Sequence, residues 1–375
     1  MDTVVTDEQR ELLDASARFM ERTCPISVLR DGSWRDDGFA ASYRKQAAEF
    51  GWFSMVVPES MAGGNISGNG VLDASLIAYR RGSALQPGSY VGTNVVAYAV
   101  ARAGSDDMRS RVLPALISGD AAATWIPHAG QLANRADDAV TARPTADGGF
   151  ELHGLANAVQ DVEAGSWLLV ACMTPNGTAQ VLVAPGTPGA TVTQLDSLDI
   201  TRCFAAVRFD SVLVPSAAVV GTPGADGDLR ARQLALACTL LAADSVGAMD
   251  HDFAITVQYA KDRIAFGRPI GSFQAVKHQL ADASLALEMS KAMVLAAADA
   301  VGADDGYGLE AASMAKAFVS ESGIDLVQTC FQVFGGIGYT WEHDQHLYLR
   351  RITTNAGLFG DASWHREYLC QLAGL

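Results

Sequence analysis

Apolar residues recur at helical spacing over the first third of the chain. The first stripe consists of Leu12, Ala15, Phe19 and Met20. Thr6 is placed to cap this helix, because a hydroxyl there can accept from the first free backbone N–H groups. A segment rich in glycine and proline, residues 55–70, interrupts the pattern, which resumes at Val71. The pattern predicts an N-terminal helical domain over residues 1–122.

The middle of the chain changes to short β-type runs separated by turn residues. These runs cover residues 150–152, 167–173, 180–184, 191–195 and 205–215. The turns between them, such as residues 147–149 and 175–177, carry the Gly and Asn that positive φ angles favour. We therefore expect a β domain over residues 123–225.

Helical patterning returns after Leu229 and continues to the end of the chain. One long stripe runs from Leu234 to Phe253 and another from Phe273 to Leu287. A third helix is expected from Leu309 to about Phe334, where two glycines follow. These helices predict a C-terminal helical bundle over residues 226–375. Helices, then strands, then helices indicate an α+β architecture.

Composition and charge narrow the class of protein. The chain has 27 basic and 42 acidic residues, a net charge of −15, and no basic run, which argues against a nucleic-acid partner. Six cysteines lie far apart with no metal-type spacing, as expected of reduced thiols in a cytosolic protein. The acidic start and the lack of an apolar run of ~20 residues argue against a signal peptide and a membrane span. We expect a cytoplasmic protein.

Two motifs carry candidate chemistry. Residues 262–274 lie between two amphipathic helices, and Arg263 is expected in the last turn of the first helix, before a turn containing Gly and Pro. Its guanidinium is suited to a phosphate ligand, although an arginine that caps a helix C-terminus has the same pattern. In residues 332–340, three glycines stand where a helix ends, so a bulky anion can approach the backbone. A helix cap with a tight turn explains these glycines equally well.

Both motifs belong to a longer set of matches in which the chain resembles the acyl-CoA dehydrogenase family. The matching blocks are residues 6–10, 50–59, 113–119, 207–215, 263–274 and 335–338. The resemblance implies a helical N-terminal domain, a β-barrel-like middle domain and a C-terminal four-helix bundle. It also implies an FAD cofactor, an acyl-CoA substrate oxidised at its α and β carbons, a tetramer, and an electron-transfer flavoprotein as electron acceptor.

The resemblance also assigns residues to the adenosine and pyrophosphate half of an FAD whose flavin ring sits in a neighbouring subunit. The residues that inherit this role are Arg263, Phe266, Gln274, Gln332, Gly335, Gly336 and Gly338. A pyrophosphate requires a guanidinium and open backbone, and an adenine requires an apolar surface such as Phe266, so the chemistry agrees.

The chain departs from the family where the flavin ring binds. The family holds the ring with a Thr-Glu-x-x-x-Gly-Ser-Asp turn and a Trp-Ile-Thr strand. Here the corresponding residues 124–131 and 156–161 lack the hydroxyl donors and the stacking ring. Asp161 and Glu163 are expected to bring negative charge to this place, which would disfavour a reduced, anionic flavin.

The general base is the second departure. Abstraction of an α proton requires a carboxylate near that carbon. The family places a glutamate at one of two positions, which correspond here to Phe359 or Gly360 and to Ala237. None of these is acidic, so no catalytic residue is assigned. The nearby carboxylates are Asp361, Asp244 and Glu342, and for each we favour a surface or pairing role.

The chain departs from the family at the flavin-ring site and at the general base, but it keeps the adenosine-binding motifs. This selective pattern leads to three hypotheses. The leading one is the catalytically incomplete subunit of a heteromeric (α2β2) enzyme, which lends its adenosine-binding half to a homologous catalytic partner. Residues 335–344 resemble the branch of actinobacterial heterotetramers that degrade steroid side chains. The second hypothesis is an independent homotetramer with a displaced base, Asp361 or Glu342. The third is a scaffold of the same fold without cofactor.

Overall fold

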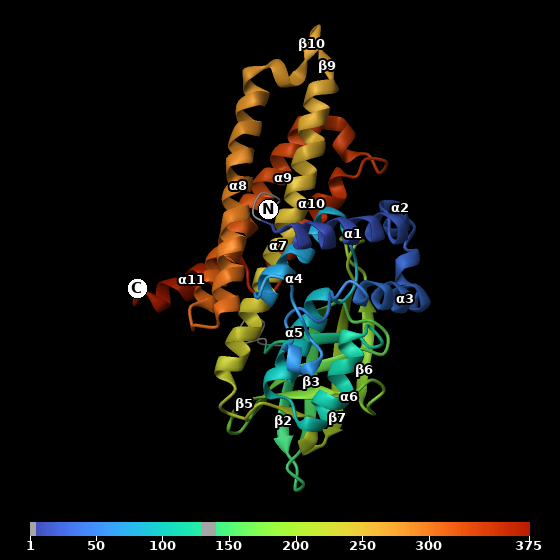
Figure 1. Cartoon of the computed structure of the whole chain (residues 1–375), viewed down its shortest axis with the longest axis vertical. Helices are drawn as coiled ribbons and strands as arrows, with labels where there is room; N and C mark the ends of the chain where they lie inside the picture. The colour runs from blue at the N-terminus through green and yellow to red at the C-terminus, as the bar shows by residue number, and fades with distance from the viewer. Residues whose placement is uncertain (1–4, 129–139) are drawn as a thin grey trace. The chain divides into compact units, whose positions relative to one another are not determined.

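The computed structural model describes residues 5–128 and 140–375. The chain divides into two compact units, each assembled from segments that are distant in sequence. The first unit contains the N-terminal segment up to Ile26, the segment Ser75–Gln86, and Cys238–Leu375. The second contains Ser27–Ala74 and Pro87–Ala237. The elements of both are labelled in Figure 1. The boundaries at residues 122 and 225 stay predictions.

The N-terminal helix of the first unit begins where the sequence predicts. In α1 (Asp7–Thr23), the Thr6 hydroxyl accepts from the Gln9 N–H at 3.2 Å, and the Gln9 side chain accepts from the Thr6 N–H at 2.9 Å. This reciprocal capping box satisfies two backbone donors at the helix start. Phe19 and Met20 on the predicted stripe are both buried.

The rest of the first unit is mainly a helical bundle. Its long helices are α7 (Gly227–Asp262), which belongs to this unit from Cys238 onward, α8 (Gln274–Ala303) and α9 (Gly308–Phe334), followed by α10 (Gln345–Gly357) and α11 (Ala362–Leu372). Because α9 packs against α8, α10 and α11, it is the central helix, and α8 runs beside it in Figure 1. Three short elements complete the bundle: β9 (Ile264–Ala265), β10 (Arg268–Pro269) and η5 (Ile270–Ser272) between α7 and α8, and η6 (Gly335–Tyr339) after α9.

Close backbone contact joins α7 to the second half of α4 (Gly70–Ser83). A Cβ atom on Gly247 would lie 1.8 Å from the Tyr79 carbonyl oxygen, and one on Gly82 would lie 1.8 Å from the Asp244 carbonyl oxygen. Only glycine fits at either position without moving backbone. The two helices therefore pack through glycines.

The helices of the second unit lie around one sheet. They are α2 (Ile26–Asp31), η1 (Ser33–Arg35), α3 (Asp37–Ala48), η2 (Glu59–Met61), α5 (Tyr90–Ala103), α6 (Asp106–Ile117) and η4 (Ser216–Ala218). Helix α5 is buried over most of its length, because it packs against α6 and the first strand. This all-round burial explains why apolar residues cover every face of that helix.

Eight strands form the sheet. They are β1 (Ala123–Ile126), β2 (Val140–Pro144), β3 (Phe150–Gln160), β4 (Trp167–Thr174), β5 (Gly177–Val183), β6 (Ala190–Leu195), β7 (Phe204–Val214) and β8 (Val219–Val220). The order is β6-β7-β3-β2-β4-β5-β8, and β1 pairs with β4 in parallel. Among the described strands β6 and β8 end the sheet without pairing to each other, so it is not closed as a barrel. The α+β fold class is nevertheless as predicted.

The sheet has its own apolar core and one irregular strand. Val170, Val181 and Val207 are fully buried within this core. The pairing of β3 with β7 shifts register between Leu152 and Gly154 and again between Ala156 and Val159. Such bulges bend a strand and re-aim its side chains. The end of β3 is therefore not a regular continuation of the sheet.

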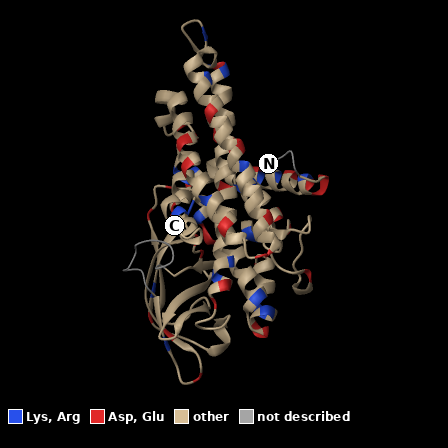
Figure 2. Cartoon of the chain, turned by 90° about the vertical axis from the view of Figure 1, so that its left-hand side faces the viewer, with Lys and Arg blue, Asp and Glu red and all other residues tan. Residues whose placement is uncertain are grey.

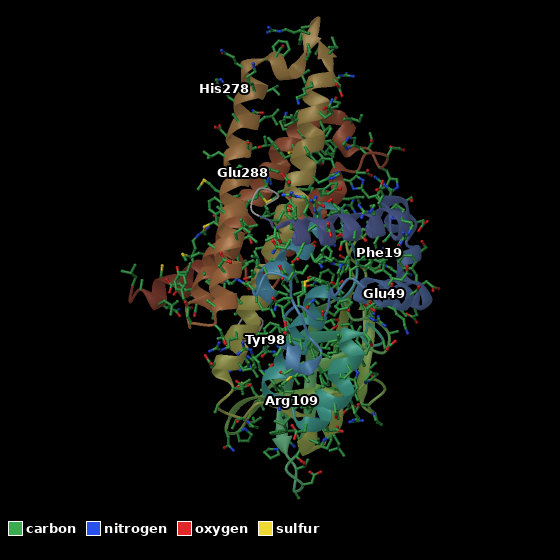
Figure 3. The ribbon with its side chains drawn as sticks, viewed as in Figure 1. Phe19, Glu49, Tyr98, Arg109, His278 and Glu288 are labelled. Atoms are coloured by element: carbon green, nitrogen blue, oxygen red, sulfur yellow. The ribbon has the colours of Figure 1, made fainter. Side chains whose placement is uncertain are left out.

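Charged residues of both signs follow one another along the long helices (Figure 2). On α8, His278 and Glu288 both lie on the exposed face (Figure 3). All six cysteines are free thiols, and four of them are buried. None of the helices over the described residues is long and apolar enough to cross a membrane.

Candidate functional site

The first candidate motif forms a hairpin between α7 and α8. Arg263 follows the last residue of α7, and its N–H donates to the Tyr259 carbonyl at 2.8 Å. Strands β9 and β10 pair in antiparallel fashion, so that Phe266 lies at the turn with a φ of +52°. The Phe266 side chain is 95% exposed. A large apolar ring held in this way is available to a partner outside the chain.

An arginine that the sequence analysis did not single out orders this hairpin. The Arg268 guanidinium lies 4.1 Å from the centre of the Phe273 ring, a cation–π arrangement. The Phe266 ring meets the same ring edge-on at 6.2 Å. Gln274, the first residue of α8, is exposed directly after Phe273. The aromatic pair and Arg268 therefore hold the predicted ligands in one short segment.

The second motif forms the end of α9. Gly335 has φ +60° and ψ −137°, a conformation that residues with a Cβ rarely adopt. Within the part of the chain that the structure describes, a Cβ atom on Gly335 or Gly336 would meet nothing within 4 Å. Gly338 is buried against Phe334, and Gln332 is exposed. Gly335 and Gly336 thus present open backbone.

The structure brings the two motifs together. The Tyr259 ring, in the last turn of α7, lies 4.8 Å from the ring of Phe334, the last residue of α9. Arg263 is one helical turn beyond Tyr259, and Gly335 directly follows Phe334. A guanidinium, open backbone and an exposed aromatic ring therefore share one end of the bundle, a set that suits an adenosine pyrophosphate.

At Phe359 and Gly360, the first of the two predicted base positions, the chain forms a tight turn. Phe359 has a φ of +56° and Gly360 a φ of +96°. The Cys238 thiol donates to the Phe359 carbonyl at 3.7 Å, and His365 Nε2 lies 3.1 Å from the same oxygen. A Cβ atom on Gly360 would lie 2.8 Å from the Trp364 ring. A side chain at Gly360 would therefore displace that ring.

A buried lysine closes this turn from the other side. Lys316 Nζ donates to the carbonyls of Ala356 and Gly360, each at 3.0 Å, and to the Ser320 hydroxyl at 3.2 Å. Burial lowers the pKa of the Lys316 ammonium to about 8. Burial, helped by Lys316, lowers the pKa of His365 to about 3, so the imidazole is neutral at pH 7. These groups hold the backbone of the turn, and neither Phe359 nor Gly360 provides an acidic side chain.

The remaining positions considered for a base have separate roles. Ala237 is fully buried within α7. Asp361 is the N-cap of α11, where its carboxylate accepts from the Trp364 N–H at 2.8 Å. Glu342 is exposed. Asp244 is buried and forms an ion pair with Arg351 at 2.9 Å. A pairing or capping role is thus observed for Asp361 and Asp244.

The segment that corresponds to the family's flavin strand lies at the irregular end of β3. Of residues 124–131, only 124–128 lie within the described residues, and β1 contributes Thr124 there. Asp161 pairs with Arg202 at 3.1 Å, and both side chains are buried. Glu163 pairs with Arg44 and accepts from the Ser89 hydroxyl at 2.7 Å. Each of the two expected negative charges is therefore paired with an arginine, which offsets it.

Comparison with known protein families identifies two regions of the chain. Residues 6–120 match the family model "Acyl-CoA dehydrogenase, N-terminal domain", and residues 229–371 match "Acyl-CoA dehydrogenase, C-terminal domain". The chain belongs to the acyl-CoA dehydrogenase family.

Individual relatives include mycobacterial proteins. Acyl-CoA dehydrogenase FadE34 of Mycobacterium tuberculosis is 33% identical over 98% of this chain, which spans only 48% of FadE34. Acyl-CoA dehydrogenase IpdE2 of Mycolicibacterium smegmatis is 28% identical, with 94% of this chain and 95% of IpdE2 covered. The ChsE4-ChsE5 complex of M. tuberculosis contains a chain that is 25% identical, with a TM-score of 0.88 and coverage of 100% and 99%. Butyryl-CoA dehydrogenase of Megasphaera elsdenii, 21% identical with full coverage of both chains, shares the fold at a TM-score of 0.89.

Proposed function

We propose that this chain is the FAD-lending, catalytically incomplete subunit of a heteromeric acyl-CoA dehydrogenase. One observation carries the proposal: the first base position is a turn closed by Lys316, Cys238 and His365, while the adenosine-binding motifs are exposed at the end of the bundle. A homologous partner would supply the base and the flavin cradle.

The residues at the end of the bundle fit the adenosine pyrophosphate half of FAD. Arg263 would pair with the pyrophosphate, and Gly335 and Gly336 would offer backbone to it. Phe266 would cover the adenine. Gln274, Gln332 and Gly338 complete the proposed set by resemblance. When bound, FAD supplies the acceptor for the hydride that leaves the β carbon of the acyl-CoA.

The missing step for this chain is proton transfer. Oxidation of a thioester at its α and β carbons begins with removal of the α proton by a carboxylate. No carboxylate stands at Phe359, Gly360 or Ala237. In the proposed α2β2 assembly a carboxylate of the partner would take that proton, and an electron-transfer flavoprotein would be the electron acceptor. The likeness to a chain of the ChsE4-ChsE5 complex supports a heteromeric assembly.

The proposed substrate is the CoA thioester of a steroid side chain. A structure named Tcur3481-Tcur3483 steroid ACAD is 26% identical to this chain, covers 98% of it, and has a TM-score of 0.85. The word steroid in that name describes the related protein and not this chain. It supports a test of a steroid side-chain thioester before a straight-chain acyl-CoA.

Flavin stoichiometry tests the proposal. The chain would be purified alone and with a homologous chain encoded beside it, and flavin absorbance compared with protein. We expect a colourless single chain and one FAD per two chains in the pair. Arg263→Gln in the pair should lower FAD content, whereas Arg366→Gln, at an exposed arginine of α11, serves as the matched control. A single chain that carries FAD and oxidises acyl-CoA at normal rates would contradict the proposal.

The other two hypotheses have distinct outcomes. An independent homotetramer would lose turnover, typically by a hundredfold or more, on Asp361→Asn or Glu342→Gln. The capping role of Asp361 counts against it as the base. A scaffold without cofactor would leave every complex that contains this chain free of FAD.

A further inference from the structure

A cavity of about 560 Å³ lies within the second unit, and none of the residues proposed to bind the adenosine pyrophosphate half of FAD lines it. Its walls include η1 and α3, the loop after β3, β4, the loop after β5, and β6. Ligand pockets for small organic molecules typically measure about 300–1,000 Å³. The volume is therefore that of a small-molecule site.

One side of this cavity is apolar. Ala40 and Ala41 of α3 line it, together with Leu168 and the β6 residues Val192 and Leu195. Val192 is 42% exposed and Leu195 is 41% exposed, which is high for residues of this kind. Both stay uncovered because β6 is the last strand at its end of the sheet. An apolar molecule in the cavity would cover them.

Two neutral hydrogen-bond donors belong to the same walls. Trp34 is 5% exposed and Ser166 is 6% exposed. Over the residues that the structure describes, neither Trp34 Nε1 nor Ser166 Oγ has a hydrogen-bond partner. A buried donor left unpaired costs on the order of 1–3 kcal/mol, so an acceptor atom that met these groups would stabilise the protein. This pair of donors points to a ligand with oxygen acceptors.

The charged groups in the walls largely compensate one another. Arg44 pairs with Glu163, and Arg202 pairs with Asp161. The third arginine, Arg35, lies 4.6 Å from the centre of the Trp34 ring and donates to the Ile200 carbonyl at 3.0 Å. Two further acidic residues, Asp37 and Asp196, also line the cavity. Three arginines against four carboxylates leave no excess of positive charge for an anion.

We propose that this cavity binds an uncharged, largely apolar small molecule that carries a carbonyl oxygen. The apolar wall of α3 and β6 would hold its body. Trp34 Nε1 and Ser166 Oγ would donate to its oxygen. This inference does not depend on the proposed lending of the adenosine-binding half, because none of the residues assigned to that half lines the cavity. Asp161, at the end of the segment that corresponds to the family's flavin strand, does line it.

Benzophenone is a suitable probe, because its light-excited carbonyl forms a covalent bond with nearby C–H groups. The full chain would be irradiated with increasing benzophenone, and the labelled peptides identified by mass spectrometry. We expect saturable labelling of the peptides that contain Val192 and Leu195 and of α3. Diphenylmethane has the same rings without the oxygen. As a competitor of the labelling it should bind about two- to tenfold more weakly than benzophenone, as expected for the loss of one or two hydrogen bonds.

Variants separate the parts of the proposal. Ala41→Trp should block labelling by filling the cavity, whereas Ala146→Trp, in an exposed turn of the same unit, should leave it unchanged. Ser166→Ala and Trp34→Phe should remove most of the preference for ketone over hydrocarbon. If Ala41→Trp does not fold, Leu195→Asp on the exposed wall makes the same test.

Three outcomes would overturn the inference. Labelling spread over the surface would show that the cavity does not bind the probe. Equal competition by diphenylmethane would show that the two donors do not recognise an oxygen atom. Tighter binding of the anion 4-benzoylbenzoate than of benzophenone would show that the site selects a carboxylate.

Discussion

The rings of Tyr259 and Phe334 lie 4.8 Å apart, at a tilt of 40°. This contact joins the last turn of α7 to the last residue of α9, two segments separated by more than 70 residues of sequence. Phe334 also packs on the ring of His343, at 4.3 Å. The contact fixes the spacing between Arg263 and Gly335, the two residues proposed to meet the pyrophosphate.

Tyr259→Leu should therefore weaken FAD retention more than it weakens the fold. Loss of the aromatic pair costs about 0.5–1.5 kcal/mol beyond the lost burial, and the two motifs would no longer be held at one spacing. FAD content of the purified pair after gel filtration, together with urea unfolding of the chain, measures both effects. Tyr307→Leu, at the exposed start of α9, is the control. Equal FAD loss in the two variants would count against a positioning role.

The buried pair of Arg351 and Asp244 predicts a large effect on stability. Arg351 donates to both carboxylate oxygens of Asp244, each at 2.9 Å, and to the Gln86 carbonyl at 2.7 Å. Both side chains are at least nine-tenths buried. Arg351→Met would leave the Asp244 carboxylate buried without its partner, and we expect the free energy of unfolding to fall by about 3–5 kcal/mol.

The control for Arg351 is an exposed ion pair in the same unit. Arg366 pairs with Glu321 at the surface, with both side chains about half exposed, so Arg366→Met should cost under about 1 kcal/mol. The double variant Arg351→Met with Asp244→Leu should recover much of the loss. Urea unfolding of all three variants decides the question, and similar losses for Arg351→Met and Arg366→Met would refute the explanation.

The fold was predictable where the pattern was long and regular. The capping box at Thr6 and the helix that ends at Phe334 follow from local chemistry, which the sequence states directly. Strand β1, in contrast, has four buried residues and no alternation, so periodicity could not distinguish it from a buried helix segment. Closure of the sheet depends on pairing between distant strands, which local pattern does not report.

The sequence predicts the proposed ligands of the site, but it does not predict the residues that hold them in place. Arg263 and Gly335 belong to motifs with chemical meaning, whereas Tyr259 and Arg268 act only through rings that the fold places beside them. Sequence analysis did not single out Lys316, because this residue lies in a helical segment and belongs to no recognisable motif. The partners of Asp161 and Glu163 were missed because Arg202 and Arg44 lie 41 and 119 residues away.

Lys316→Met should loosen the turn at Phe359 and Gly360. The substitution removes the only donor that the described residues provide to the Gly360 carbonyl through a side chain, and it also frees the Ala356 carbonyl. We expect a loss of about 1–3 kcal/mol in the free energy of unfolding and faster amide hydrogen exchange over residues 356–361. Lys277→Met on the exposed face of α8 should change neither. Unchanged exchange in the turn would mean that Cys238 and His365 hold it without the lysine.

The stability of the first unit should depend on pH through Asp252. This side chain is fully buried on α7, and burial raises the pKa of its carboxyl to about 8, although Gln345 Nε2 donates to it at 3.3 Å. Between about pH 4 and pH 8 the folded chain keeps a proton that the unfolded chain releases, so the free energy of unfolding falls as pH rises through this window, at up to about 1.4 kcal/mol per unit.

Asp252→Asn lacks that proton equilibrium and should gain stability relative to the unsubstituted chain from pH 5 to pH 8, with little further gain above. Urea unfolding at pH 5, 6.5, 8 and 9 measures the difference, with the exposed Asp325→Asn as the control. A difference that stays constant across these pH values would show that Asp252 is ionised in the folded chain at neutral pH.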